Sequence, residues 1–136
     1  MKSTTLLGFV SLACITTLSL CCQSALAGNP AHPEQAVSFK TDVRPLLDDY
    51  CLSCHVPGGK GYDKSGLDMR TYQSLLKGTK FGSIIKPGNA QDSTLIVLVE
   101  GRADPSISMP YGIKGGLSRD KIAVLRKWID QGAKDN

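Results

Sequence analysis

The stretch Cys51-Leu52-Ser53-Cys54-His55 places two thiols three positions apart and follows them directly with an imidazole. A disulfide across this pair would close a very small loop and would remove little entropy from the unfolded chain. A thioredoxin-type redox pair needs a strand–helix–strand setting, and the sequence shows no such alternation. A closed zinc site usually takes two ligand pairs. The second pair would have to come from His32 and His55, and His55 abuts Cys54, which is poor chelating geometry.

Covalent haem attachment explains this spacing, because C-x-x-C-H is the pattern through which c-type haem is bound. Two thiols add to the two vinyl groups on one edge of the porphyrin, so they must occupy adjacent positions of a helical turn. The next residue then lies under the ring, where its imidazole can reach the iron. We therefore predict one haem c attached through Cys51 and Cys54, with His55 as an iron ligand.

Three further residues are candidates for the sixth iron ligand. Met109 lies in a stretch with many turn residues and few helix or strand cues, and a loop can hold a thioether over the open haem face. Met69 fits better as a flexible apolar filler near the haem edge. His32 stands between two prolines near the start of the mature chain and keeps a bis-His alternative open. His/Met ligation would raise the reduction potential relative to two nitrogen ligands.

Residues 1–27 carry the pattern of a secretory signal peptide. Lys2 stands near the start, a mostly apolar run spans Leu6 to Cys22, and Ala25-Leu26-Ala27 provides an A-x-A cleavage site. An uncleaved membrane anchor is the alternative, but the run is at the short end for crossing a bilayer. We predict cleavage after Ala27 and a periplasmic or otherwise extracytoplasmic location.

Cleavage would leave one small domain whose only cysteines are Cys51 and Cys54. It removes one lysine and so lowers the formal net charge of the 136-residue chain from +4 to +3. We predict a flexible leader over residues 28–38 and a single domain over residues 39–136, without a stable membrane span. The charge balance is too mild to indicate a nucleic-acid partner.

The composition predicts a thin core, since 41% of the chain is hydrophobic but only 6% is aromatic. A bound macrocycle would supply the missing apolar surface, so folding should depend on haem. Cap and glycine signals predict an all-α fold of about four or five helices with long loops wrapped around one covalent haem. Val56–Gly61 is expected to be a loop. The expected helices are one capped by Asp42 that leads into Cys51, Thr71–Lys77 before Gly78, Thr94–Glu100 before Gly101, and one from Ser118 to Gly132.

Several stretches outside the motif carry a family resemblance, namely Asp42–Leu47, Ser65–Asp68, Ile85–Gly88, Met109-Pro110 and Leu125–Ala133. Together with the motif they resemble a monohaem cytochrome c domain of the planctomycete type, over nearly all of the mature chain. The resemblance implies a small cytochrome c fold in which the first and last helices cross beside the haem, with Trp128 and Leu125 at the crossing. It also implies His55 as the proximal and Met109 as the distal iron ligand.

The resemblance and the motif together imply a one-electron carrier with His/Met-ligated iron, and not an enzyme. One alternative is a haem-based ligand sensor with a labile sixth ligand, and another is the electron-accepting subunit of a larger dehydrogenase. A peroxidase would want a distal His or Arg, and His32 in the leader is the only spare histidine. Domains of this kind are often fused to larger proteins, whereas this chain shows no second domain. We therefore expect separate redox partner proteins of unknown identity.

Five lysines fall in segments near the proposed site, namely Lys60, Lys64, Lys77, Lys80 and Lys86. They suggest a docking patch for an acidic redox partner. A solvated surface without a docking role is the favoured interpretation, because charged side chains usually lie on surfaces anyway.

Overall fold

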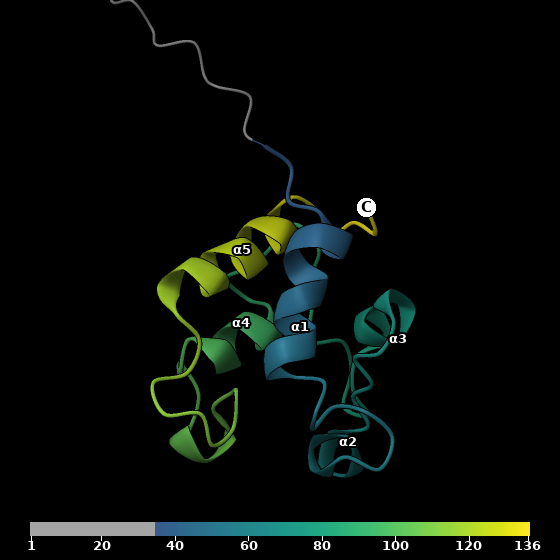
Figure 1. The fold of residues 1–136 in the computed structure, drawn as a ribbon, viewed down its shortest axis with the longest axis vertical. Coiled ribbons are helices and arrows are strands. Elements are labelled where there is room, and N and C mark those ends of the chain that lie inside the picture. The colour runs from purple at the N-terminus through teal and green to yellow at the C-terminus, as the bar shows by residue number, and fades with distance from the viewer. Residues whose placement is uncertain (1–34) are drawn as a thin grey trace, which may run out of the picture. The chain divides into compact units, whose positions relative to one another are not determined.

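The computed structural model describes residues 35–136, and every regular element in this part of the chain is helical (Figure 1). The prediction of an all-α fold with four or five helices is therefore confirmed for these residues. The predicted signal peptide, most of the predicted leader and His32 lie outside the described residues. The elements are η1 (Phe39–Val43), α1 (Arg44–Tyr50), α2 (Lys60–Ser65), α3 (Tyr72–Lys77), α4 (Thr94–Val99), η2 (Pro105–Ile107) and α5 (Arg119–Asp130).

The first helix begins earlier than the sequence predicted. Its cap is Ser38, whose hydroxyl accepts a hydrogen bond from the Thr41 amide while its own amide donates to the Asp42 carboxylate. Ser38 and Asp42 therefore cap the helix together, with Ser38 as the cap residue and Asp42 inside the first turn. The prediction that Asp42 is the cap residue was wrong. Pro45 lies in the first turn of α1, where a missing N–H is tolerated. The single helical turn η1 and helix α1 run without a break toward Cys51.

The first and last helices pack against each other, as the family resemblance implies (Figure 1). The ring of Phe39 in η1 lies 5.4 Å from that of Trp128 in α5 and 5.2 Å from that of Tyr72, measured between centroids. Trp128 and Leu125 are each 1% exposed. Aromatic rings in such offset and edge-on arrangements attract one another beyond the area that they bury. This aromatic cluster fixes the orientation of the first helical segment, η1 and α1, relative to α5.

Two of the later helices, α3 and α4, lie where the sequence predicted them. At α3, Thr71 and Ser74 form a reciprocal capping box, and Gly78 ends the helix. At α4, Ser93 is the cap residue, but its hydroxyl accepts from the Lys86 amide and donates to the Asn89 carbonyl instead of bonding its own helix. Ser93 thus joins the start of α4 to the turn that precedes it.

Helix α2 was not predicted, because the stretch Val56–Gly61 was expected to be a loop. The loop ends at Gly59, and the helix starts at Lys60. Its amide at Tyr62 donates to the carbonyl of Cys54, at 2.9 Å. The helix is short and contains a glycine, so its local propensity is weak and this contact with the preceding motif contributes to its stability.

One hydrophobic core joins the elements. Five elements each contribute a completely buried side chain: Val43 from η1, Leu47 from α1, Leu75 from α3, Ile96 from α4 and Ile129 from α5. Within residues 35–136 the search for membrane-spanning helices found none of sufficient length and hydropathy. Packing against this shared core holds the end of α1, and with it the motif, in a defined position.

Candidate haem site

The cysteine motif forms a tight turn at the end of α1. The Cys51 amide donates to the Leu47 carbonyl at 3.0 Å and so continues the helical pattern. The amides of Cys54 and His55 both donate to the Cys51 carbonyl, at 3.1 and 3.0 Å. The two thiols and the imidazole therefore originate from one turn of backbone, which is the arrangement that thioether attachment requires.

Both thiols of the motif are free. Cys51 is half-buried and Cys54 is exposed. Burial raises the pKa of Cys51 to about 11, and the nearby Arg44 only partly opposes this effect. The Cys51 thiol is therefore protonated at neutral pH, and the structure contains no disulfide between the two residues.

The imidazole of His55 is buried, with 8% of the residue exposed. Its Nδ1 atom is buried and has no hydrogen-bond partner. Burial lowers the pKa of His55 below its ordinary value, while the backbone of Leu67 acts in the opposite direction. The ring is thus neutral at physiological pH, which is the form that binds a metal.

These features fit a haem c. Two free thiols at the required spacing match the two vinyl groups, and a neutral, buried imidazole next to them matches an axial ligand. Within residues 35–136, no three His, Cys, Asp or Glu side chains form a group that could hold a metal ion by themselves.

Met109 comes from a different part of the chain, in the segment between η2 and α5. The side chain is half-buried against the core, and its amide donates to the Leu98 carbonyl of α4 at 3.2 Å. Figure 1 shows this segment on one side of the lower end of α1 and α2 on the other. Met69 is instead 3% exposed within the core, and its amide donates to the His55 carbonyl. Met69 is thus largely engaged in packing, whereas Met109 is less enclosed.

Residues 51–110 match the family model for planctomycete cytochrome C. This match confirms the resemblance drawn from the sequence for these residues. It contains the whole cysteine motif and ends just after Met109. A cytochrome c segment indicates a haem-binding electron carrier, with haem c as its cofactor. Cytochrome c domains typically work outside the cytoplasm and do not act as enzymes. Neither the curated proteins nor the solved structures gave a match.

The backbone partners that hold the cysteine motif in place were not found from the sequence. The Tyr62 amide bonds the Cys54 carbonyl, and the Met69 amide bonds the His55 carbonyl, each at 2.9 Å. Main-chain hydrogen bonds do not depend on particular side chains, so the sequence does not reveal them. A glycine-rich loop after the motif was the only available signal, because it permits a close return of the chain.

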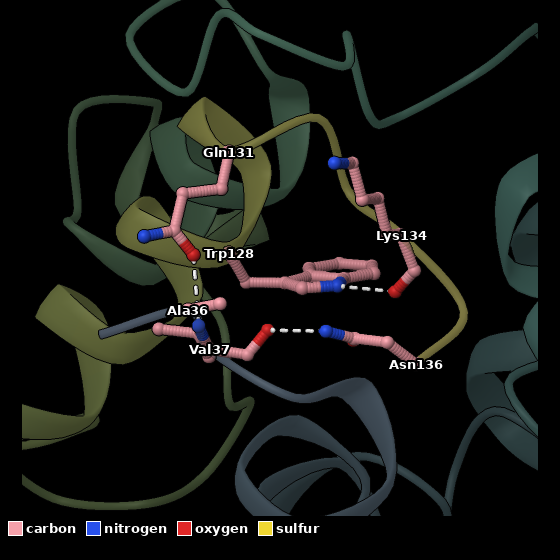
Figure 2. Close-up of a pocket in the computed structure, with 6 residues that line it drawn as sticks. All are labelled: Ala36, Val37, Trp128, Gln131, Lys134 and Asn136. Carbon is pink, nitrogen blue, oxygen red and sulfur yellow. Dashed lines mark hydrogen bonds between the residues drawn. The ribbon is translucent and has the colours of Figure 1, made fainter. Parts of the chain in front are cut away.

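A separate pocket of about 290 Å³ lies where the two ends of the described chain meet (Figure 2). Its lining includes none of the predicted site residues. The Val37 amide donates to the Gln131 side chain at 2.8 Å, the Asn136 side-chain amide donates to the Val37 carbonyl, and the Trp128 indole donates to the Lys134 carbonyl. The polar groups around the pocket thus pair with one another, and these hydrogen bonds hold the two ends of the described chain together. Its lining residues are Ala36, Val37, Trp128, Gln131, Lys134 and Asn136.

Proposed function

We propose that this protein is an exported monohaem c-type cytochrome that carries one electron at a time. The observation that carries the proposal is the single turn that presents two free thiols and a buried, neutral imidazole, inside the segment that matches the cytochrome family. The predicted export signal supports it, since a covalent link prevents loss of haem outside the cytoplasm. Cleavage after Ala27 and a domain over residues 39–136 are parts of this proposal.

The protein contributes attachment, ligation and exclusion of water. When bound, haem supplies an iron that alternates between the ferric and ferrous states. Cys51 and Cys54 would hold it through thioether bonds, and His55 would be the proximal ligand. The burial of His55 limits access of water to the proximal side. Because the chain holds its donor groups on a packed scaffold, the change in oxidation state would need little rearrangement.

Met109 is the proposed distal ligand. Its backbone is tied to α4 and its side chain is only partly enclosed, whereas the side chain of Met69 is enclosed within the core. A thioether in the sixth position would give a six-coordinate iron of raised potential, which suits electron transfer. The same ligand would occupy the position that a gas sensor has to keep open, so this assignment favours a carrier over a sensor.

Acid–acetone extraction of the purified secreted protein tests the proposal. We expect the porphyrin to stay with the polypeptide after denaturation, because a thioether survives this treatment. Variants Cys51→Ser and Cys54→Ser should each retain one bond and the double variant none. Ser53→Ala, which leaves both thiols in place, is the matched control. A porphyrin that leaves the wild-type chain with the solvent would contradict covalent attachment.

A further inference from the structure

Helix α2 lies directly against the imidazole of His55 at Gly61. A methyl group placed on the Cα of Gly61 would lie 2.8 Å from Cε1 and 3.0 Å from Nδ1 of that ring. It would also lie 3.0 Å from the carbonyl oxygen of Cys54. Non-bonded heavy atoms attract best at about 3.5–4.0 Å and repel strongly at these shorter distances. Residue 61 can therefore carry no side chain while α2 and the ring keep their positions.

The backbone conformation of Gly61 does not explain why it is a glycine. Within residues 35–136, ten of twelve glycines have a positive φ, and the two exceptions are Gly59 and Gly61. Both exceptions are the glycines whose added Cβ would collide with the motif, since at Gly59 it would lie 2.5 Å from the Cys54 carbonyl oxygen. Glycine also disfavours a helix relative to alanine. Close approach to the motif is the feature that requires glycine at position 61.

The ring and the helix cannot separate freely. The His55 amide donates to the Cys51 carbonyl at 3.0 Å, and the His55 carbonyl accepts from the Met69 amide at 2.9 Å. The Tyr62 amide, next to Gly61, donates to the Cys54 carbonyl at 2.9 Å. The main chain is thus fixed on both sides of the contact. A larger residue at position 61 would have to rotate the ring or break one of these hydrogen bonds.

We infer that Gly61 is a positioning residue, which lets the backbone of α2 fix the rotation of the His55 ring. This inference rests on the proposed function, in which the ring is an axial ligand of haem iron. Groups that orient a metal ligand change the properties of the metal without touching it. The rotation of an axial imidazole about its bond to iron affects the relative energies of the iron d orbitals, so Gly61 would influence the spectrum and the potential.

The test compares Gly61→Ala with Gly101→Ala. Alanine at 61 should keep the covalent haem, shift the g values of the ferric protein and the midpoint potential, and lower the thermal midpoint. Gly101 has a φ of 65° and nothing within 4 Å of an added Cβ, so its variant should lose stability through backbone strain alone. It should keep the wild-type g values and potential. Wild-type values of both quantities in Gly61→Ala, with equal or higher stability, would overturn the inference.

If the Gly61→Ala variant does not accumulate, a measurement on the wild type tests whether Gly61 packs against the His55 ring. We expect a nuclear Overhauser effect between the Gly61 Hα protons and the His55 ring protons in the folded, diamagnetic ferrous protein. Its absence there would overturn the inference. A secreted wild-type protein without haem would instead refute the proposed function, which distinguishes that failure from a failure of the inference.

Discussion

His55 and Met109 differ in how firmly the chain holds them. The main chain of His55 is hydrogen-bonded on both sides and its ring is buried. Met109 is half-buried, and its amide donates one hydrogen bond to the Leu98 carbonyl. A residue held from several directions keeps its geometry when its neighbours change. The distal side is therefore where single substitutions should alter the electronic properties of the site most readily.

Replacing Met109 with Ala tests its assignment. The variant should keep its covalent haem but lose the iron–sulfur charge-transfer absorption and show a lower midpoint potential, because the thioether is gone. Redox titration followed by visible spectroscopy measures both quantities. Met69→Leu is the control, since it preserves an apolar side chain of similar volume in the core. If Met109→Ala keeps both the absorption and the potential, while Met69→Leu loses the absorption and has a lower potential, the ligand is Met69.

At the scale of the elements, the packing of η1 and α1 against α5 determines the position of the cysteine motif, which follows α1 directly. Trp128 fills the crossing at 1% exposure and contacts the ring of Phe39. We predict that Trp128→Ala lowers the free energy of unfolding by about 3–5 kcal/mol, because it leaves a cavity in a packed core. Phe81→Ala is the aromatic control, since Phe81 is 81% exposed. Denaturant titration of both variants checks this, and equal losses would contradict the assigned role of the crossing.

An ionic contact joins α4 to α5. The carboxylate of Glu100 accepts hydrogen bonds from Arg126 of α5 and from Arg102. These bonds, the one from Arg126 above all, hold the pKa of Glu100 below its ordinary value. Because the folded state lowers the pKa, the contact stabilises the fold above the ordinary glutamate pKa of about 4.3. This contribution is lost as the pH falls through the folded-state value.

Glu100→Gln should therefore lower the free energy of unfolding by about 1 kcal/mol at pH 7, as expected for a small surface network. Near pH 3 the difference between the variant and the wild type should be smaller than at pH 7, because the contribution of the ion pairs is lost as the pH falls through the lowered pKa of Glu100. Denaturant titrations at the two pH values measure the difference. Asp68→Asn, which breaks a pair with Arg70 inside one loop, is the control and should change stability less. An equal loss for Glu100→Gln at both pH values would rule out the ionic contribution.

Elements with strong local signals were predictable, and those made by tertiary contact were not. The cap at Thr71 and the glycine at position 78 define α3 by local bonds, so the sequence indicates it directly. Helix α2 instead depends on a bond between the Tyr62 amide and the Cys54 carbonyl. The start of the first helix was misplaced for a similar reason, since Ser38 and Asp42 cap it jointly and either residue alone is a plausible start.

At the scale of the whole molecule, the motif was recognisable from the spacing of its thiols and imidazole. The resemblance to the family whose model matches residues 51–110 was carried by stretches outside the motif. The packing of Gly61 against His55 was not, because nothing in the sequence distinguishes it from the loop glycines around it. Several large apolar side chains remain exposed in the described chain, including Phe81 and Tyr111 at 81% and 73%. Such surface is consistent with a core that the protein alone does not complete.

The fold should therefore depend on haem. We predict that the double variant Cys51→Ser, Cys54→Ser, secreted without haem, loses most of its far-ultraviolet helical signal at 25 °C or has a thermal midpoint lower by about 20 °C or more. Circular dichroism during heating measures this, with Ser53→Ala as the haem-containing control. A colourless double variant that melts cooperatively at the wild-type temperature would show that the chain folds on its own.

The intact mass of the denatured, secreted wild-type protein tests the central assignment most directly. We predict a single species that begins at Gly28, has the mass of the polypeptide plus one haem, and takes up no maleimide, because both remaining thiols are bound. A species with the mass of the polypeptide alone that takes up two maleimide groups would contradict the account.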